Sequence, residues 1–507
     1  MTFFSRPNDD AVGSFHYGLG LVEFTLSDPA HALIKDLFEG RSPSFGEIDD
    51  ERLEVLAYEA TSLVHEMRHF FDLFGTAGGC ALFITRISIL KQFAAVCTAM
   101  AGDNAPWRLP IEIFAAAADC PPNTRAFVRR ARAFEVASQV YLAPFAPLEV
   151  EGHLSDLTVE VPFQGGGAVD AFPVRMFRVA GEGRPVPRTV LYPLGVETLL
   201  EGNAHAIART FVERSFPKRI AQRFTQNVWT MDVSDRAARD RRAAETIKPY
   251  MVTDLLITRF LKERGFDTFD RDAVLAATDR TLATCTLRVE EQVPGTTKVE
   301  IERAGAVLVD VLNHEEVKSL AKGLVEASAD LTAAYRNFLR VIERLPDWTT
   351  IPDDLSPSSS IAIWEAYMAR TFIVPLLRER LATDDKAFTT YDGFLALLPK
   401  IGLPPARVAN GRLMLNVMPA RVQQAWWHQM MLGDLMRQMI AGGELVLCPR
   451  AIAPEDTIPG ISTTNLAFEK QCAAHIKLGC GTFQPGRTSL APRCLFEDSL
   501  RVSALRR

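Results

Sequence analysis

The sequence predicts an α+β protein that is mainly helical, and three observations carry this prediction. Residues 49–75 repeat apolar side chains at three- and four-residue spacing, as one long amphipathic helix does. Residues 147–193 alternate in the β manner between Gly-rich and Pro-rich breaks, which is typical of antiparallel hairpins. From about residue 195 the pattern is mostly helical again, so we expect helices around a small antiparallel β region.

Each further element follows from local composition. The aromatic and β-branched content of residues 15–26 predicts a strand, and an apolar run predicts a helix over 80–102. The acidic start of the 49–75 helix suits the positive end of a helix dipole, and Gly75 suits the residue just after its end. Four further expectations complete the order: a helix over 123–140, an extended stretch over 285–304, a Pro-, Asp- and Ser-rich linker over 345–360 and a last helical block over 361–441.

Composition excludes several classes of protein. The chain has 507 residues, of which 48% are hydrophobic and 23% charged, as in globular proteins that bury large cores. Its net charge of −6 and its lack of long basic runs argue against nucleic acid as a main partner. No secretory signal is visible at the N-terminus, so we expect a cytoplasmic protein whose eight cysteines are thiols.

A membrane is not expected as a partner either. The most membrane-like run starts at residue 80 and carries Arg86 and Lys91 in its interior. Each of these charges is costly at the centre of a bilayer. The run therefore predicts a buried or amphipathic helix.

The long helix carries the motif His65-Glu66-x-x-His69. Nine histidines and 62 acidic residues give roughly 0.02 chance occurrences of such a motif in this chain, so its surroundings must be considered. Residues four apart lie one above the other on a helix, so both imidazoles can point at one metal ion. They fall on the side opposite the apolar stripe, with Tyr58 and Asp72. The alternative interpretation is a solvated face with two unconnected histidines.

Glu66 favours the metal interpretation. In zinc hydrolases the metal lowers the pKa of its bound water, and a neighbouring carboxylate takes the proton. The motif resembles the active-site helix of the zincin superfamily of zinc metallopeptidases. The third histidine of the metzincins would fall at residue 75, which is a glycine in this chain. Gluzincins instead take their third ligand from a glutamate on a later helix, often within E-G-x-A.

Residues 201–204, Glu-Gly-Asn-Ala, look like that second gluzincin helix. The resemblance implies that Glu201 is the third zinc ligand. It also gives His205, one turn on, a catalytic role beside the ligands or the oxyanion. The small Gly202 and Ala204 would let the two helices approach closely. The alternative is a surface ladder of ion pairs four residues apart, at positions 197, 201, 205 and 209.

A second candidate for the third ligand is Glu365. It lies in an apolar helical run, where a carboxylate is costly to bury unless it is paired or bound to metal. Arg370 could be its partner. Glu365 could also line a substrate cleft.

The tail contains half of the cysteines. Cys448, Cys472, Cys480 and Cys494, with His475, could form a structural zinc site, although the usual double C-x-x-C knuckle is missing. Small buried thiols are the alternative. The expected divisions of the chain are 1–245, a zincin-like catalytic core; 246–350, a helical region; 351–441, a helical block; and 442–507, the cysteine-containing tail.

The function that this resemblance implies is zinc-dependent hydrolysis of peptide bonds in a protein or peptide substrate. His65, His69 and Glu201 would hold Zn²⁺, and Glu66 would act as base and then as acid. In zincins a strand ahead of the active-site helix commonly holds the substrate backbone, and residues 20–26 could provide it. A different class remains open: a helical interaction or scaffold protein with a vestigial or structural metal site.

Overall fold

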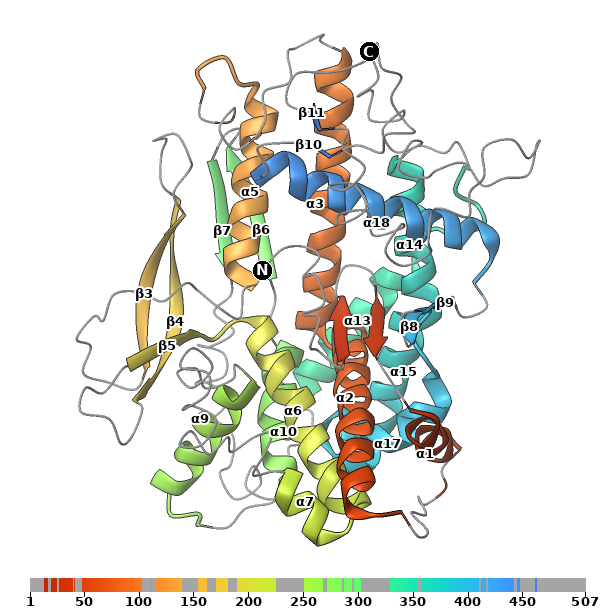
Figure 1. The fold of residues 1–507 in the computed structure, drawn as a ribbon. Helices are drawn as coiled ribbons and strands as arrows, with labels where there is room; N and C mark the ends of the chain where they lie inside the picture. Colours follow the sequence, from red (N-terminus) through yellow and green to blue (C-terminus); the bar gives the residue numbers. More distant parts are fainter. Residues whose placement is uncertain are drawn as a thin grey trace.

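The structure is a computed structural model of the whole chain (Figure 1). It describes residues 13–16, 20–24, 27–39, 41, 48–102, 111, 115, 117–138, 154–161, 170–180, 189–224, 250–267, 271–284, 287–293, 296–301, 329–352, 357–409, 412–415, 418–441, 445–446 and 461–462.

The described part is mainly helical, as predicted. The helices expected over 49–75, 80–102 and 123–140 are present as α2, α3 and α5. The helices are α1 (Asp28–Phe38), α2 (Asp50–Gly75), α3 (Ala77–Gly102), α5 (Pro122–Ser138), α6 (Val196–Ser215), α7 (Lys218–Phe224), α9 (Tyr250–Glu263), α10 (Asp272–Thr284), α13 (Ala329–Glu343), α14 (Pro357–Met368), the π-helical turn η3 (Ala369–Ile373), α15 (Val374–Thr383), α16 (Lys386–Thr389), α17 (Tyr391–Ile401) and α18 (Ala420–Ala441).

Helix α2 begins where the sequence predicts and ends for a different reason. The Asp49 carboxylate accepts a hydrogen bond from the Arg52 amide and so caps the first turn. Gly75 is the last helical residue, and Thr76 follows in extended conformation, so no left-handed glycine ends the helix. A Cβ at Gly75 would lie 2.3 Å from Cε1 of Phe388. Close packing, rather than a turn, therefore requires this glycine.

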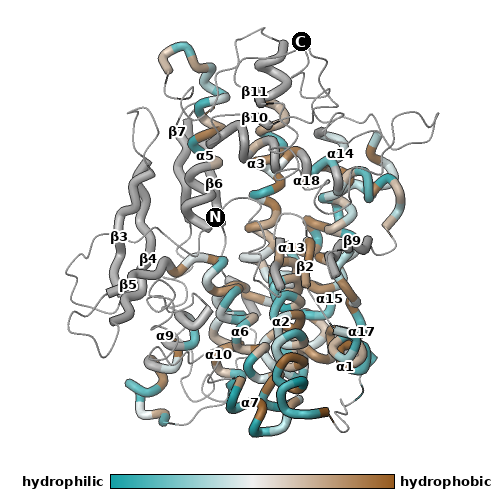
Figure 2. Tube along the Cα trace, viewed as in Figure 1, coloured by the Kyte–Doolittle hydropathy of each residue, from teal (hydrophilic) through white to brown (hydrophobic). Residues whose placement is uncertain are grey.

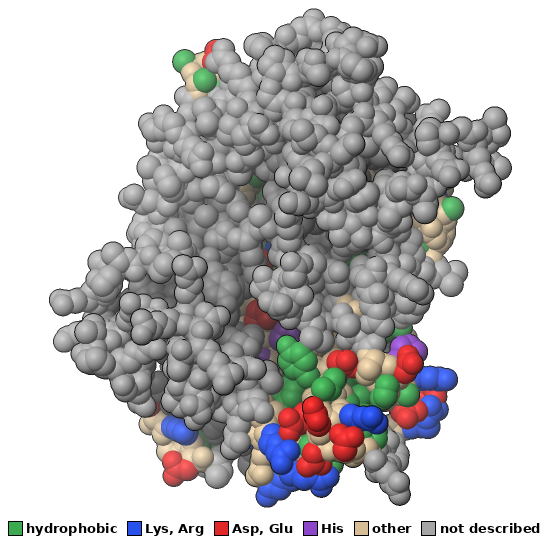
Figure 3. Space-filling view, viewed as in Figure 1, with side chains coloured by type: hydrophobic (Ala, Val, Ile, Leu, Met, Phe, Trp, Pro, Cys, Tyr) green, Lys and Arg blue, Asp and Glu red, His purple; other side chains and the backbone are tan. Residues whose placement is uncertain are grey.

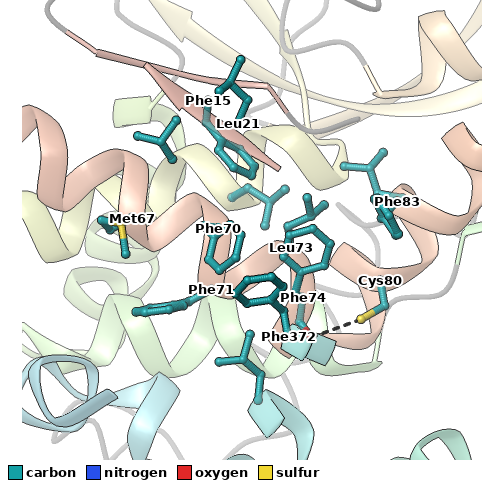
Figure 4. Close-up of a cluster of buried hydrophobic side chains, with 14 of the residues drawn as sticks. Phe15, Leu21, Met67, Phe70, Phe71, Leu73, Phe74, Cys80, Phe83 and Phe372 are labelled. Atoms are coloured by element: carbon teal, nitrogen blue, oxygen red, sulfur yellow. Dashed lines mark hydrogen bonds between the residues drawn. The ribbon is translucent and has the colours of Figure 1, made fainter. Parts of the chain in front are cut away.

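Aromatic side chains on the apolar side of α2 build the centre of the core (Figure 4). The ring of Phe70 lies edge-on to Phe74 and to Phe372 of η3, with centroids 5.0 and 5.1 Å apart. Phe71 meets Phe394 of α17 in the same way at 5.6 Å. In Figure 2 hydrophobic positions recur on α2 and α3. The α2 helix is thereby fixed against both the N-terminal and the C-terminal parts of the chain.

Short strands form four small sheets. Their order is β1-β2-β8-β9, β3-β4-β5, β6-β7 and β10-β11. The strands are β1 (Gly13–His16), β2 (Leu21–Phe24), β3 (Leu154–Val161), β4 (Asp170–Ala180), β5 (Thr189–Pro193), β6 (Leu287–Val293), β7 (Thr296–Ile301), β8 (Ala406–Ala409), β9 (Arg412–Leu415), β10 (Leu445–Val446) and β11 (Ile461–Ser462).

The first sheet corrects one expectation. Residues 15–26 do not form one strand, because β1 and β2 pair antiparallel with Gly20 at φ +57° just before β2. Strand β2 also pairs parallel with β8, and β8 pairs antiparallel with β9. The antiparallel hairpins expected within 147–193 are present as β3-β4-β5, and the extended stretch near 285–304 is the hairpin β6-β7.

Two helical stretches, Ala77–Val96 and Ser358–Thr383, are long and apolar enough to cross a membrane by length and composition alone. Buried residues make up 67% and 72% of their most apolar windows. Core helices have the same composition and burial. The burial of Arg86 within the first stretch agrees with the buried helix predicted there.

Parts of the predicted organisation lie outside the described residues. In the expected linker, residues 345–352 form turns and 357–360 open α14, and residues 353–356 are not described. Cys448, Cys472, His475, Cys480 and Cys494 also lie outside the described residues. The four expected divisions of the chain stay a prediction.

Candidate metal centre

The polar side of α2 becomes more buried along the helix. The side chain of His65 is 18% exposed and that of His69 only 2%, while Asp72, one turn further on, is fully buried. At the other end of this side Tyr58 is 39% exposed. Helix α6 packs along α2 (Figure 1). The histidine pair therefore does not lie on a solvated face.

Helix α6 brings a carboxylate to the two imidazoles. Oε2 of Glu201 lies 3.3 Å from Nε2 of His65 and 3.3 Å from Nε2 of His69. The two Nε2 atoms are 3.0 Å apart. Among the described residues, these three form a group that could hold a metal ion. The fold thus brings the histidine motif and the predicted glutamate together, although 136 positions separate His65 from Glu201 in the sequence.

The triangle of donor atoms fits a tetrahedral ion. Zinc binds imidazole nitrogen and carboxylate oxygen at about 2.0–2.2 Å in tetrahedral geometry. In a tetrahedron the distance between two ligand atoms is about 1.6 times the bond length, which gives ~3.3 Å here. The three observed separations of 3.0, 3.3 and 3.3 Å are close to that edge. Three donors on one face leave the fourth position for water or substrate.

Glu66 lies next to this triangle in the sequence and is buried, with 8% of its surface exposed. Burial raises the pKa of its carboxyl group above the usual value, and the nearby rings of His65 and His69 partly oppose this shift. A raised pKa makes a carboxylate a stronger base, so it accepts a proton more readily.

The electrostatics of the metal-free group favour an ion pair. Burial alone would lower the pKa of His69, but the Glu201 carboxylate outweighs burial and raises this pKa to about 9. Burial would likewise raise the pKa of Glu201, yet the two histidines hold it well below its usual range. At neutral pH Glu201 is thus ionised and the ring of His69 is protonated. Figure 3 shows histidine and acidic side chains in a recess of the molecular surface.

The alternative interpretation of α6, an exposed ladder of ion pairs at positions 197, 201, 205 and 209, is wrong. Glu197 is 1% exposed and pairs with Arg86 of α3. Burial raises the pKa of Glu197 to about 7 against the opposing charge of Arg86. Arg209 pairs instead with Asp254, at 3.0 Å, on α9. The first part of α6 is therefore an interior helix.

The competing ligand candidate is engaged elsewhere. Oε2 of Glu365 lies 2.5 Å from Nζ of Lys91, on α3. Arg370, its expected partner, donates to the backbone carbonyls of Glu343 and Leu345. The structure therefore gives Glu365 a partner other than the histidine pair.

Gly202 permits close packing, but against a different helix from the one expected. A Cβ at Gly202 would lie 2.6 Å from Cβ of Thr253 on α9. Oγ1 of Thr253 donates to the carbonyl of Thr198, so α9 is fixed to the side of α6. His205 is 2% exposed, and its catalytic role stays a prediction.

A buried polar network beside the triangle was not predicted as part of the site. Nδ2 of Asn203 donates to Oδ2 of Asp72 at 3.0 Å, and Nε of Arg68 donates to the same oxygen at 2.9 Å. The sequence places Asp72 on the histidine side of α2 and Arg68 four residues before it, which is the spacing of a helical ion pair. That spacing could have indicated the pair, but nothing in the sequence indicates Asn203.

Comparison with known proteins adds no family to this geometry. No protein-family model, no curated protein and no solved structure matches the chain.

Proposed function

We propose that the protein is a zinc-dependent hydrolase of peptide bonds, with His65, His69 and Glu201 as the metal ligands. The observation that carries the proposal is the triangle of two Nε2 atoms and Oε2, with edges of 3.0, 3.3 and 3.3 Å. The donor set, two imidazoles and one carboxylate, is one that catalytic zinc sites use. It supports a site of the gluzincin kind, in an α+β fold of the zincin class.

Zinc, when bound, supplies positive charge that makes water easier to deprotonate and polarises a carbonyl group. Glu66 then takes the proton of the attacking water and returns it to the nitrogen of the leaving amine. Its raised pKa suits this role, because burial makes the carboxylate a stronger base than an exposed glutamate. The exposed parts of His65 and Glu201, 18% and 20% of their side chains, give a substrate access to the triangle.

A peptide substrate needs backbone partners, and the first sheet offers one edge. The strand expected to hold the substrate, within residues 20–26, is β2, and it is not available because β1 lies on one side of it and β8 on the other. Strand β1 is one of the two outer strands of this sheet, and the ring of its Phe15 stacks on His69 with centroids 6.0 Å apart. We propose that an extended protein or peptide substrate lies along β1, and that the enzyme is cytoplasmic.

Metal content tests the ligand assignment directly. The purified protein should contain about one zinc per chain by elemental analysis. His65→Ala and Glu201→Ala should each lose most of this zinc, because two protein donors hold zinc much more weakly than three. Glu365→Ala is the matched control and should keep it, since Glu365 pairs with Lys91. A metal-free protein that also fails to take up added zinc would favour the interaction or scaffold alternative.

Glu66→Gln separates binding from chemistry. The amide keeps the shape of the side chain but cannot accept the water's proton, so zinc should remain bound. Cleavage of an unfolded casein substrate should fall at least ~100-fold, the usual contribution of general acid–base catalysis. Cleavage by this variant at the wild-type rate would exclude the assigned mechanism.

A further inference from the structure

The donor triangle depends on the register of two helices. Helix α2 supplies His65 and His69, and helix α6 supplies Glu201, so a small slide of either helix separates the carboxylate from the rings. Functional sites need their groups held to within about 0.5 Å. Some contact other than the ligands themselves must fix this register before a metal binds.

The contact with the right placement joins Asp72 to Asn203. Nδ2 of Asn203 donates to Oδ2 of Asp72 at 3.0 Å, and both side chains are fully buried. Asp72 lies three residues after His69, and Asn203 lies two residues after Glu201. The hydrogen bond is thus within one turn of a donor on each helix.

Arg68 keeps the Asp72 carboxylate in place. Nε of Arg68 donates to Oδ2 of Asp72 at 2.9 Å, and its Nη2 donates to the carbonyl of Phe388 at 2.7 Å. The guanidinium also lies 5.6 Å from the ring centroid of Phe394. A buried carboxylate that turned away from the Arg68 guanidinium would lose the charge that compensates its desolvation. The acceptor offered to Asn203 is therefore fixed in position.

We propose that Asp72 and Asn203 are positioning residues that set the distance between the histidine pair and Glu201. The inference rests on the proposed function for its importance, because the register matters most if the triangle holds a metal. Neither residue belongs to the donor triangle. Their effect passes through the two helices.

Asn203→Ala should weaken metal binding without removing a ligand. Loss of such outer contacts typically lowers metal affinity 10- to 100-fold. Zinc affinity would be measured by competition with a chromophoric chelator, and the visible absorption spectrum of bound Co²⁺ would report the geometry of the site. Both should change.

A matched control separates positioning from general stability. Ser360→Ala removes another buried hydrogen bond between two helices, which joins Oγ of Ser360 and Nδ1 of His428 at 2.6 Å. It should lower the melting temperature while leaving zinc affinity and the Co²⁺ spectrum unchanged. If Asn203→Ala does not fold, Asn203→Ser keeps a shorter donor and should show a smaller shift in the same direction.

A measurement on the metal-free protein tests the positioning role separately from the proposed function. In the metal-free protein labelled at histidine rings, Asn203→Ala should shift the ring signals of His65 and His69 in nuclear magnetic resonance spectra, and Ser360→Ala should not. If the wild-type protein binds no metal, the proposed function fails and these signals still decide the positioning role. Wild-type ring signals in a folded Asn203→Ala protein, or a zinc affinity within about twofold of wild type, would overturn the inference.

Discussion

His69 is the residue at which protons and metal compete. Its ring is 2% exposed, and Nε2 lies 3.3 Å from Oε2 of Glu201. Burial disfavours its charged form, yet the Glu201 carboxylate raises its pKa to about 9 in the metal-free protein. A metal can bind this nitrogen only after the proton has left.

Metal binding should therefore release a proton and strengthen with pH. Because the pKa of His69 is raised to about 9, the ring is protonated throughout the neutral range and becomes free only above that pH. The apparent zinc affinity should rise by up to about tenfold per pH unit from pH 7 to 9 and then level off. Titration calorimetry in buffers of different ionisation enthalpy would count the released protons. An affinity that is flat across this range would show that His69 is neutral before metal binds.

For single residues, the sequence predicts the candidate metal ligands better than the side chains that hold them in place. His65, Glu66 and His69 are recognisable because helical spacing alone brings them together. Glu201 was indicated by its E-G-x-A setting, which the structure places at the same point. The contact of Asn203 with Asp72 depends on the packing of helices whose residues are 131 positions apart, and no local pattern encodes that.

The corner between α2 and α3 shows how elements are joined. Oγ1 of Thr76 donates to the carbonyl of Asp72 and accepts from the amide of Gly79. A Cβ at Gly79 would lie 2.3 Å from the backbone oxygen of Asp72, whereas a Cβ at Gly75 would meet the ring of Phe388. A side chain at Gly79 would therefore collide with backbone, whereas a side chain at Gly75 would collide with another side chain.

We therefore expect alanine substitutions at Gly75 and Gly79 to affect stability differently. Gly75→Ala should lower the free energy of unfolding by about 1–3 kcal/mol, as overpacked cores do. Adding Phe388→Leu should recover part of that loss, because the obstructing ring can be replaced. Gly79→Ala should be at least as destabilising and should gain nothing from Phe388→Leu. Urea unfolding of the four variants measures these differences, and equal recovery in both glycine backgrounds would contradict the packing described.

Helix positions were predictable because periodicity is local. The expected 49–75 helix begins at Asp50 and ends at Gly75. The expected strand over 15–26 was wrong because its aromatic and β-branched residues belong to two strands, with Gly20 at positive φ between them. The pairing of β2 with β8 has no signal in the sequence of either strand.

Arg380 connects distant parts of the whole molecule. Its guanidinium donates to both carboxylate oxygens of Asp279 at 2.8 Å, to Asp385 at 2.9 Å and to the carbonyl of Gly75 at 2.7 Å. Arg380, Asp279 and Asp385 are all buried. The guanidinium carbon of Arg380 also lies 3.9 Å from the ring centroid of Phe388. One side chain thus satisfies groups from α2, α10 and the start of α16.

Arg380→Met should destabilise the whole protein strongly. It leaves Asp279 and Asp385 buried without their cation, and breaking a buried pair in this way costs about 3–5 kcal/mol. Arg378→Met, on the same helix, is the matched control. Arg378 pairs with Glu343 while 65% exposed, so its loss should cost less than about 1 kcal/mol. Comparable losses for the two variants in denaturant unfolding would mean that the Arg380 cluster contributes no special stability.

The parallel pairing of β2 with β8 has a consequence for synthesis on the ribosome. Leu21 pairs with Ala406, so one side of β2 stays without its partner until just over four-fifths of the chain has been made. A nascent chain can already contain every residue of the donor triangle while β2 still presents an open strand edge, which invites pairing with other chains. Translation order thus completes the donor triangle long before β2 meets its second partner strand.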